Sequence, residues 1–264
     1  MIVGFHCPYK GNIGFEDCLR CAGTQHQPCA FSYPILWGMM QGEQEDVEGI
    51  RVTWLLNCLR KVALEGRHDL YVAPEELYWS FRGRLAHAIV EYAQAEDAIV
   101  EERFTREVAG IPITGKADVI YPARRLLVDY KTTVTVPKRG PYQHHALQLS
   151  IYRWLVQAHF RISRLEVVYL DMRETRKYPV LALPLRRVEE LIAPRARLLD
   201  VALKGGALPP QAEGQGLWQC WGYCPFVHHP DCWGEKGPPE RNRRETRVES
   251  RRRAIRRAYA RRGK

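Results

Sequence analysis

The chain has 264 residues, of which 45% are hydrophobic and 27% are charged, and its formal net charge is +10. This composition excludes a disordered or low-complexity chain, and no apolar run approaches the roughly 20 residues that span a bilayer. Residues 1–9 lack the charged-then-apolar pattern of a signal peptide, so we expect a cytoplasmic protein with no membrane partner. The positive charge favours a polyanionic partner such as nucleic acid.

The N-terminal region is rich in cysteine. It contains four of the eight cysteines in the chain, Cys7, Cys18, Cys21 and Cys29. A cytoplasmic compartment keeps thiols reduced, so we interpret these cysteines as metal ligands rather than disulfide partners. Their spacing predicts a small four-cysteine zinc site, for which His6 and His26 are substitute ligands. Such a site would contact DNA or a protein partner, or would only stabilise the fold.

Hydrophobic periodicity predicts alternating helices and strands through the middle of the chain. The predicted order is helix, three strands, helix, strand and helix, over residues 74–95, 99–108, 111–121, 126–134, 144–160, 164–172 and 187–203. From residue 208 onwards the sequence becomes a proline-, glycine- and cysteine-bearing loop region. Residues 241–264 are dominated by arginine and are either a phosphate-binding arm or a solvated tail.

An Asp-x-Lys sequence lies on the third predicted strand. Side chains alternate along a strand, so Asp129 and Lys131 project from the same side, and Asp118 on the preceding strand reaches that side in the right register. Two carboxylates there would bind Mg²⁺ or Mn²⁺, and the lysine would help to orient an attacking water. The alternative is a solvated Asp–Lys pair on the sheet surface. The following helix, which carries Gln148 and Tyr152 four residues apart, favours the functional interpretation.

The first predicted helix adds a histidine to this set. His87 and Glu91 lie four residues apart, so an ordinary pairing along the helix face is the alternative to a role for His87 as a metal ligand. Glu102, near the start of the first predicted strand, is a weaker acidic candidate.

Together these motifs resemble the RecB-like branch of the PD-(D/E)XK nucleases, which includes the CRISPR-associated exonucleases and the AddB nuclease domains. The resemblance covers residues 51–233 and rests on the sequences RGRLAHAIVE, GKAD, VDYK and QLSIY. It implies an α/β, restriction-endonuclease-like core in which a central mixed sheet is flanked by helices. Every motif position holds a residue of the expected type, which favours an active enzyme.

The resemblance also implies a role for each motif residue. It assigns metal ligation to the side chains of His87, Asp118 and Asp129 and to the main-chain carbonyl of Tyr130. It assigns catalysis to Lys131, and a place near DNA to Gln148 and Tyr152.

A second group of cysteines brackets the predicted core. Cys220, Cys224 and Cys232 follow it, and Cys58 precedes it. Four thiolates suit either zinc or an iron–sulfur cluster, and the spacing leaves both open. The split of one cysteine before the core and three after it resembles the iron–sulfur staple of the RecB-like family, which implies a structural [4Fe–4S] cluster. The alternative for Cys58 is a buried thiol without a metal.

These patterns predict three regions: a cysteine-rich appendage over residues 1–48, a nuclease domain over 49–234 and a basic tail over 235–264. We expect a Mg²⁺- or Mn²⁺-dependent deoxyribonuclease that acts as an exonuclease on single-stranded or frayed ends. CRISPR adaptation and DNA repair or recombination are its expected settings, with a protein partner in a DNA-processing complex. The alternative is a non-catalytic nucleic-acid-binding adaptor with structural metal sites.

Overall fold

The computed structural model describes residues 1–24, 29–41, 47–92, 96–221 and 224–240. The chain divides into two compact units, Met1–Pro209 and Pro210–Lys264. Within the described part of the chain, no helix combines the length and the apolar character that a membrane span requires. The basic tail over 241–264 and His26 lie outside the described residues.

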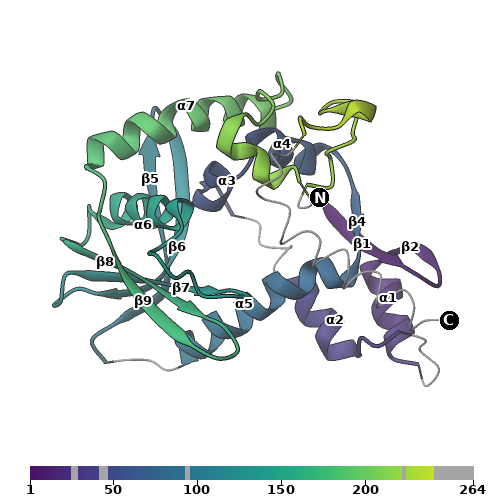
Figure 1. Ribbon diagram of the computed structural model, residues 1–264, viewed down its shortest axis with the longest axis horizontal. Coiled ribbons are helices and arrows are strands. Elements are labelled where there is room, and N and C mark those ends of the chain that lie inside the picture. Colours follow the sequence, from purple (N-terminus) through teal and green to yellow (C-terminus); the bar gives the residue numbers. More distant parts are fainter. Residues whose placement is uncertain (25–28, 42–46, 93–95, 222–223, 241–264) are drawn as a thin grey trace. The chain divides into compact units, whose positions relative to one another are not determined.

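A six-stranded mixed sheet forms the centre of the first unit (Figure 1). The strands are β3 (Ile50–Arg51), β5 (Ile99–Val108), β6 (Ile111–Tyr121), β7 (Leu126–Thr132), β8 (Arg164–Leu170) and β9 (Thr175–Val180). Strand β6 pairs antiparallel with β5 and β7 and parallel with β3. Strand β8 pairs parallel with β7 and antiparallel with β9. The expected α/β fold with a mixed sheet is therefore confirmed.

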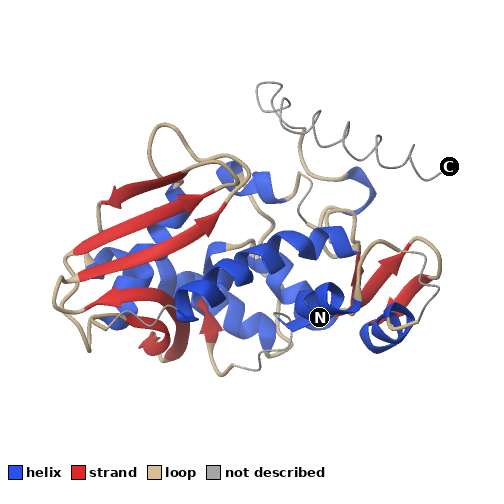
Figure 2. Ribbon diagram, turned by 90° about the horizontal axis from the view of Figure 1, so that it is seen from below, coloured by secondary structure: helices blue, strands red, loops and turns tan. Residues whose placement is uncertain are grey.

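Helices cover both faces of this sheet (Figure 2). They are α3 (Val52–Leu56), α4 (Leu59–Arg67), α5 (Pro74–Tyr92), α6 (Gln143–Val156) and α7 (Leu185–Leu203). On one face, buried residues of α6 and α7, including Trp154 and Val188, pack with strand residues such as Leu127 in the main core. On the other face, Val90 of α5 packs against a small cluster that contains Val119 and Val128. The sheet is therefore sandwiched between α6 and α7 on one side and α5 on the other.

Shorter elements form a second, smaller assembly within the first unit. A three-stranded sheet joins β1 (Ile2–Cys7), β2 (Gly11–Gly14) and β4 (Leu70–Val72), and α1 (Phe15–Ala22) and α2 (Tyr33–Met40) pack beside it. The hydrophobic pattern predicted none of these elements. Strand β9 and helices α3 and α4 were also not predicted, whereas the seven predicted elements are present with ends shifted by up to four residues.

In the second unit, the described residues contain two short 3-10 helices, η2 (Gly214–Gln219) and η3 (Gly234–Lys236). This agrees with the loop-rich character that the sequence predicts after residue 208.

Gly115 on β6 allows α6 to lie close against the sheet. A Cβ atom at this position would lie 2.7 Å from Cε1 of Tyr152 and 2.9 Å from Cγ2 of Val52, which is closer than real Cβ contacts come. Both neighbours belong to packed helices, so neither can move freely. The absence of a side chain therefore lets Tyr152 approach the strand that carries Asp118.

We predict that Gly115→Ala lowers the free energy of unfolding by about 1–3 kcal/mol, because overpacking forces α3 or α6 away from the sheet. Urea denaturation followed by circular dichroism measures this change. Gly66→Ala is the matched control, since its Cβ would meet Leu203 at an ordinary 3.6 Å within α4 and should stabilise the protein slightly. Wild-type stability in Gly115→Ala would contradict the close approach.

Candidate metal centre

Two buried aspartates meet where β6 and β7 lie side by side. Asp118 is 4% exposed and Asp129 is fully buried. One carboxylate oxygen of Asp118, Oδ2, accepts a 2.7 Å hydrogen bond from the backbone N–H of Tyr130, the residue that follows Asp129. The hairpin register therefore brings the two acidic side chains together, as the sequence predicted.

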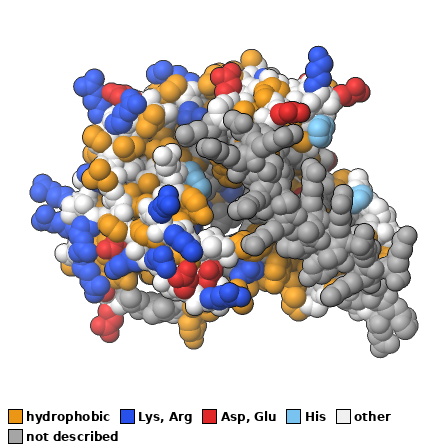
Figure 3. All heavy atoms as spheres, in the orientation of Figure 1, with side chains coloured by type: hydrophobic (Ala, Val, Ile, Leu, Met, Phe, Trp, Pro, Cys, Tyr) orange, Lys and Arg blue, Asp and Glu red, His pale blue; other side chains and the backbone are white. Residues whose placement is uncertain are grey.

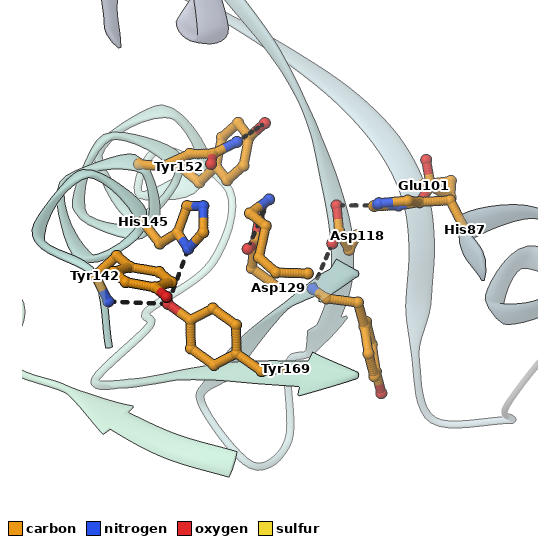
Figure 4. A network of polar contacts seen from close by, with 11 residues as sticks. His87, Glu101, Asp118, Asp129, Tyr142, His145, Tyr152 and Tyr169 are labelled. Carbon is orange, nitrogen blue, oxygen red and sulfur yellow. Dashed lines mark hydrogen bonds and ion pairs between the residues drawn. The ribbon is translucent and has the colours of Figure 1, made fainter. Parts of the chain in front are cut away.

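Lys131 lies beside Asp129 on the same side of β7, as strand alternation predicts. Its Nζ lies 2.9 Å from Oδ1 and 2.8 Å from Oδ2 of Asp129 (Figure 4). Only Oδ1 accepts a hydrogen bond from the ammonium group with acceptable geometry, so the buried Oδ2 of Asp129 is left without a hydrogen bond. Burial opposes the charged form of Lys131, but the charges of Asp129 and Asp118 outweigh it and raise the pKa of the lysine.

His87 reaches this site from α5. Its Nδ1 donates a 2.7 Å hydrogen bond to Oε1 of Glu101 and lies 3.5 Å from Oδ1 of Asp118. The other oxygen of Glu101 lies 2.9 Å from Nζ of Lys116. The bond to Glu101 raises the pKa of His87 despite its partial burial. His87 therefore pairs with Glu101 of the sheet, whereas the alternative that the sequence left open paired it with Glu91 of its own helix.

Glu101 is the third acidic residue that lies in the site, whereas Glu102, the weaker acidic candidate in the sequence, is exposed. Glu101 has φ +52°, a left-handed conformation that is uncommon for any residue except glycine. The strand changes face at this point: Phe104 and Val108 contribute to the main core, but Val100, also even-numbered, lies in the cluster on the opposite face. Side chains of β5 therefore do not alternate strictly between the two faces of the sheet at this point. Such alternation is the only pattern in the sequence that could indicate which glutamate faces the site.

Strand β6 changes face at the corresponding position. Ala117 lies in the main core, Val119 lies in the opposite cluster and Ile120 lies in the main core again. The pairing register places Asp118 opposite Glu101, between the pairs Val119↔Val100 and Ala117↔Glu102. Both strands are therefore irregular at the same level. A strained residue held inside a strand by its neighbours is typical of functional sites.

The site concentrates acidic groups. Three carboxylates, on Asp118, Asp129 and Glu101, lie beside two ammonium groups, on Lys131 and Lys116, and beside the imidazole of His87, which adds a positive charge when it is protonated. Burial, and then the negative charge of Asp129, raise the pKa of Asp118 above its ordinary value. A divalent cation would reverse this effect, because it favours ionised carboxylates.

The residues of the site fit a hard divalent ion. His87, Glu101 and Asp118 offer three ligand atoms that lie within 4.8 Å of one another. The Oδ2 atom of Asp129, buried and without a hydrogen bond, is a fourth ligand atom that a cation would satisfy. Mg²⁺ and Mn²⁺ prefer such carboxylate oxygens and retain positions for water and phosphate.

Gln148 and Tyr152 lie one helical turn apart on α6 and are both buried. Nε2 of Gln148 donates a 3.0 Å hydrogen bond to Oη of Tyr152. Burial raises the pKa of Tyr152, while the nearby charge of Lys131 opposes this shift. Both residues therefore lie on the side of the site where Lys131 is found, and the tyrosine remains protonated.

Aromatic and histidine side chains extend the site between the start of α6 and β8, and Figure 4 shows three of them, Tyr142, His145 and Tyr169. Tyr169, opposite Lys131 in the β7–β8 register, accepts a 3.0 Å hydrogen bond from the Tyr142 N–H and lies 2.8 Å from Nδ1 of His145. The rings of Tyr142 and His144 are stacked, with centroids 5.7 Å apart and an angle of 16° between their planes. Burial, and then the charge of Lys131, lower the pKa of His144. The motifs in the sequence did not single out this cluster.

The two cysteine groups differ in their place in the fold. Cys7 ends β1, Cys18 and Cys21 lie on α1, and Cys29 lies between α1 and α2, so all four belong to the small N-terminal assembly. Cys58 precedes α4 in the first unit, whereas Cys220, Cys224 and Cys232 belong to the second unit.

We predict that the two aspartates have opposite effects on the metal-free protein. Asp118→Asn should stabilise it by about 1 kcal/mol at pH 8, because the substitution removes a buried charge that repels Asp129. Asp129→Asn should destabilise it by about 2 kcal/mol, because Lys131 loses its partner. Thermal unfolding in EDTA measures both changes.

The effect of Asp118→Asn should depend on pH with a defined sign. The folded wild type holds the Asp118 proton more tightly than the unfolded chain does, so wild-type stability falls as pH rises from the ordinary value of 3.8 towards the raised folded pKa. The asparagine variant lacks this loss, so its advantage should grow across that window. An advantage that is constant with pH would contradict the charge explanation.

Comparison with known proteins supports the fold and identifies the family. The crystal structure of the protein SSO0001 is similar over 76% of this chain and 95% of its own, with 23% identity and a TM-score of 0.55. That of a phage-related exonuclease from Haemophilus somnus 129PT matches over 61% and 94%, with 11% identity and a TM-score of 0.40. None of the curated proteins matches the chain. The model of the PD-(D/E)XK nuclease superfamily matches residues 38–229, which is most of the chain, so the protein belongs to that superfamily.

Proposed function

We propose that this protein is a Mg²⁺- or Mn²⁺-dependent deoxyribonuclease of the RecB-like branch. The observation that carries the proposal is the convergence of Asp118, Asp129 and Lys131, with a buried Asp129 oxygen that accepts no hydrogen bond. A structural role alone would not require two buried carboxylates whose charges oppose each other.

Within this proposal, His87, Asp118, Asp129 and the main-chain carbonyl of Tyr130 would hold the metal ion, which would supply polarisation of the phosphate and activation of water. Glu101 accepts the Nδ1 proton of His87 and so fixes the orientation of the imidazole ring. We assign Glu101 as a positioning residue on this basis.

The protein's own groups then act on the phosphodiester. Asp129 holds the ammonium group of Lys131 at 2.8–2.9 Å, where its positive charge can orient water and stabilise negative charge that develops on the phosphate oxygens. Gln148 and the protonated Tyr152 line the same side and supply neutral hydrogen-bonding groups. Such pre-oriented groups need little rearrangement during the reaction.

The substrate that we propose is a single-stranded or frayed DNA end. Tyr142 is 43% exposed and already stacked on His144, and the lowered pKa of His144 keeps that ring uncharged near neutral pH. An unpaired base can extend such a stack, whereas a base inside a duplex cannot reach it. Lys138 and Arg139, exposed in the loop just before Tyr142, would attract the phosphates.

A basic surface supports a nucleic-acid partner. Lys and Arg side chains gather on the side of the first unit where β8, β9 and the start of α7 lie (Figure 3). They include the exposed Arg164, Arg176, Lys177, Arg186 and Arg187. Three glutamates, Glu166, Glu174 and Glu190, pair with them and offset part of this charge. Exposed ion pairs are weak, so a polyanion can compete for these arginines.

Several finer assignments remain part of the proposal. The four cysteines Cys58, Cys220, Cys224 and Cys232 are the complement that a [4Fe–4S] cluster requires, and we propose that they hold one as a structural staple. A role in CRISPR adaptation or in DNA repair, with a protein partner, follows the same resemblance. The alternative function, a non-catalytic DNA adaptor, would not require Lys131 beside the two aspartates.

We predict that Asp118→Ala, Asp129→Ala and Lys131→Ala each reduce cleavage at least about a hundredfold, since each removes a group that acts on the transition state. Hydrolysis of end-labelled DNA with Mn²⁺, with Mg²⁺ and with EDTA measures the effect. Glu102→Gln is the matched control, because Glu102 is exposed beside Glu101 and should retain activity. Full activity in either aspartate variant would overturn the proposed function.

We predict that Tyr142→Ala weakens binding of single-stranded DNA by about 5- to 150-fold, the range that corresponds to one lost base stack of roughly 1–3 kcal/mol. Tyr142→Phe should bind like the wild type, because it keeps the ring. The measurement uses DNA with 2-aminopurine near its end and the Lys131→Ala background, so that no cleavage intervenes. Unchanged quenching of 2-aminopurine in Tyr142→Ala would exclude the stack while leaving the metal chemistry intact.

A further inference from the structure

We propose that Cys7, Cys18, Cys21 and Cys29 together bind one Zn²⁺ ion, in a structural centre separate from the nuclease site. None of these residues takes part in the function proposed above. Four thiolates form a soft, fully anionic ligand set that suits Zn²⁺ in tetrahedral geometry and not Mg²⁺.

The four cysteines lie on three short segments of the same small N-terminal assembly. Cys7 ends β1 and pairs with Gly11 across the β1–β2 hairpin. Cys18 and Cys21 lie three residues apart on α1, so they share one face of the helix. Helix α1 packs on this hairpin. Cys29 lies shortly before α2, with its Sγ 3.7 Å from the carbonyl oxygen of Phe31.

Cys21 faces the β1–β2 hairpin, since it lines one surface hollow together with Asn12 and Ile13 of β2. Four thiolates within one small assembly would repel one another, and a bound Zn²⁺ ion would remove this repulsion.

The size of the local core supplies the physical reason for a metal. Among the residues that the structure describes, the cluster that holds β1, β2, α1 and α2 contains seven buried side chains: Phe5, Phe15, Leu36, Met39, Met40, Val72 and Leu77. Helix α1 has eight residues and β2 has four, so neither is stable by itself. Small assemblies of this kind commonly depend on a metal or disulfides in place of a large core. Zn²⁺ would join the hairpin, the helix and the following loop at one point.

The test is elemental analysis and zinc K-edge X-ray absorption of the full-length protein purified without chelators and without oxygen. We expect about one zinc per chain, with four sulfur neighbours at about 2.3 Å. Zinc absorption is element-specific, so iron elsewhere in the chain does not interfere. This measurement needs no variant and no cleavage assay, so its outcome is independent of the nuclease proposal.

Variants then identify the ligands. The double variant Cys18→Ser and Cys21→Ser should lose at least about nine-tenths of the zinc, because serine hydroxyls are poor zinc ligands. His6→Ala is the matched control: His6 adjoins Cys7, its Nδ1 lies 2.9 Å from Oδ1 of Asn12, and zinc should be retained. Cys220→Ser should also retain zinc. Absence of zinc from the wild type, iron bound in its place, or full zinc in the double variant would each overturn the proposal.

Discussion

The constraint on which the site depends is the burial of two like charges, Asp118 and Asp129, on neighbouring strands. Their mutual repulsion and the loss of hydration are only partly offset by Lys131 and by the backbone N–H of Tyr130. A packed sheet must hold them in place, because a loop would relax and let water reach the carboxylates. In the proposed function, a bound cation would relieve this repulsion, so the same two charges that oppose folding of the metal-free protein would favour metal binding.

The strand that carries Asp129 could be predicted closely because it obeys strict alternation. Leu127, Asp129 and Lys131 share one face, and the printed sequence alone places the lysine beside the aspartate. Glu101 could not be predicted in this way, because its left-handed backbone reverses the alternation between Val100 and Phe104. No residue pattern marks the reversal, since neither strand contains a glycine at that point. The loss of alternation arises because β5 and β6 are irregular at the same level of the sheet. It therefore depends on how the two strands pair and not on the local sequence of either.

The small N-terminal assembly was missed for a different reason. Its strands and helices have three to eight residues, which is shorter than the window over which hydrophobic periodicity can be recognised. Helix α2, for example, is apolar on nearly every side, because residues such as Leu36 and Met39 pack inward while Trp37 remains half exposed. Cysteine spacing was the only readable signal in this region, and it reports ligand chemistry rather than secondary structure.

Helix α5 links this assembly to the metal centre. Nη2 of Arg84 donates hydrogen bonds of 2.8 and 2.9 Å to the carbonyl oxygens of Gly38 and Met39 at the end of α2, and Phe81 packs directly on Gly38. His87 follows Arg84 by less than one helical turn and is held at its other side by Glu101. A histidine on a helix is positioned only as accurately as the helix itself. The packing of α2 on α5 therefore fixes the backbone position of His87, and the hydrogen bond to the strained Glu101 fixes its imidazole ring. Residues outside the PD-(D/E)XK motifs contribute to the geometry of the site in this way.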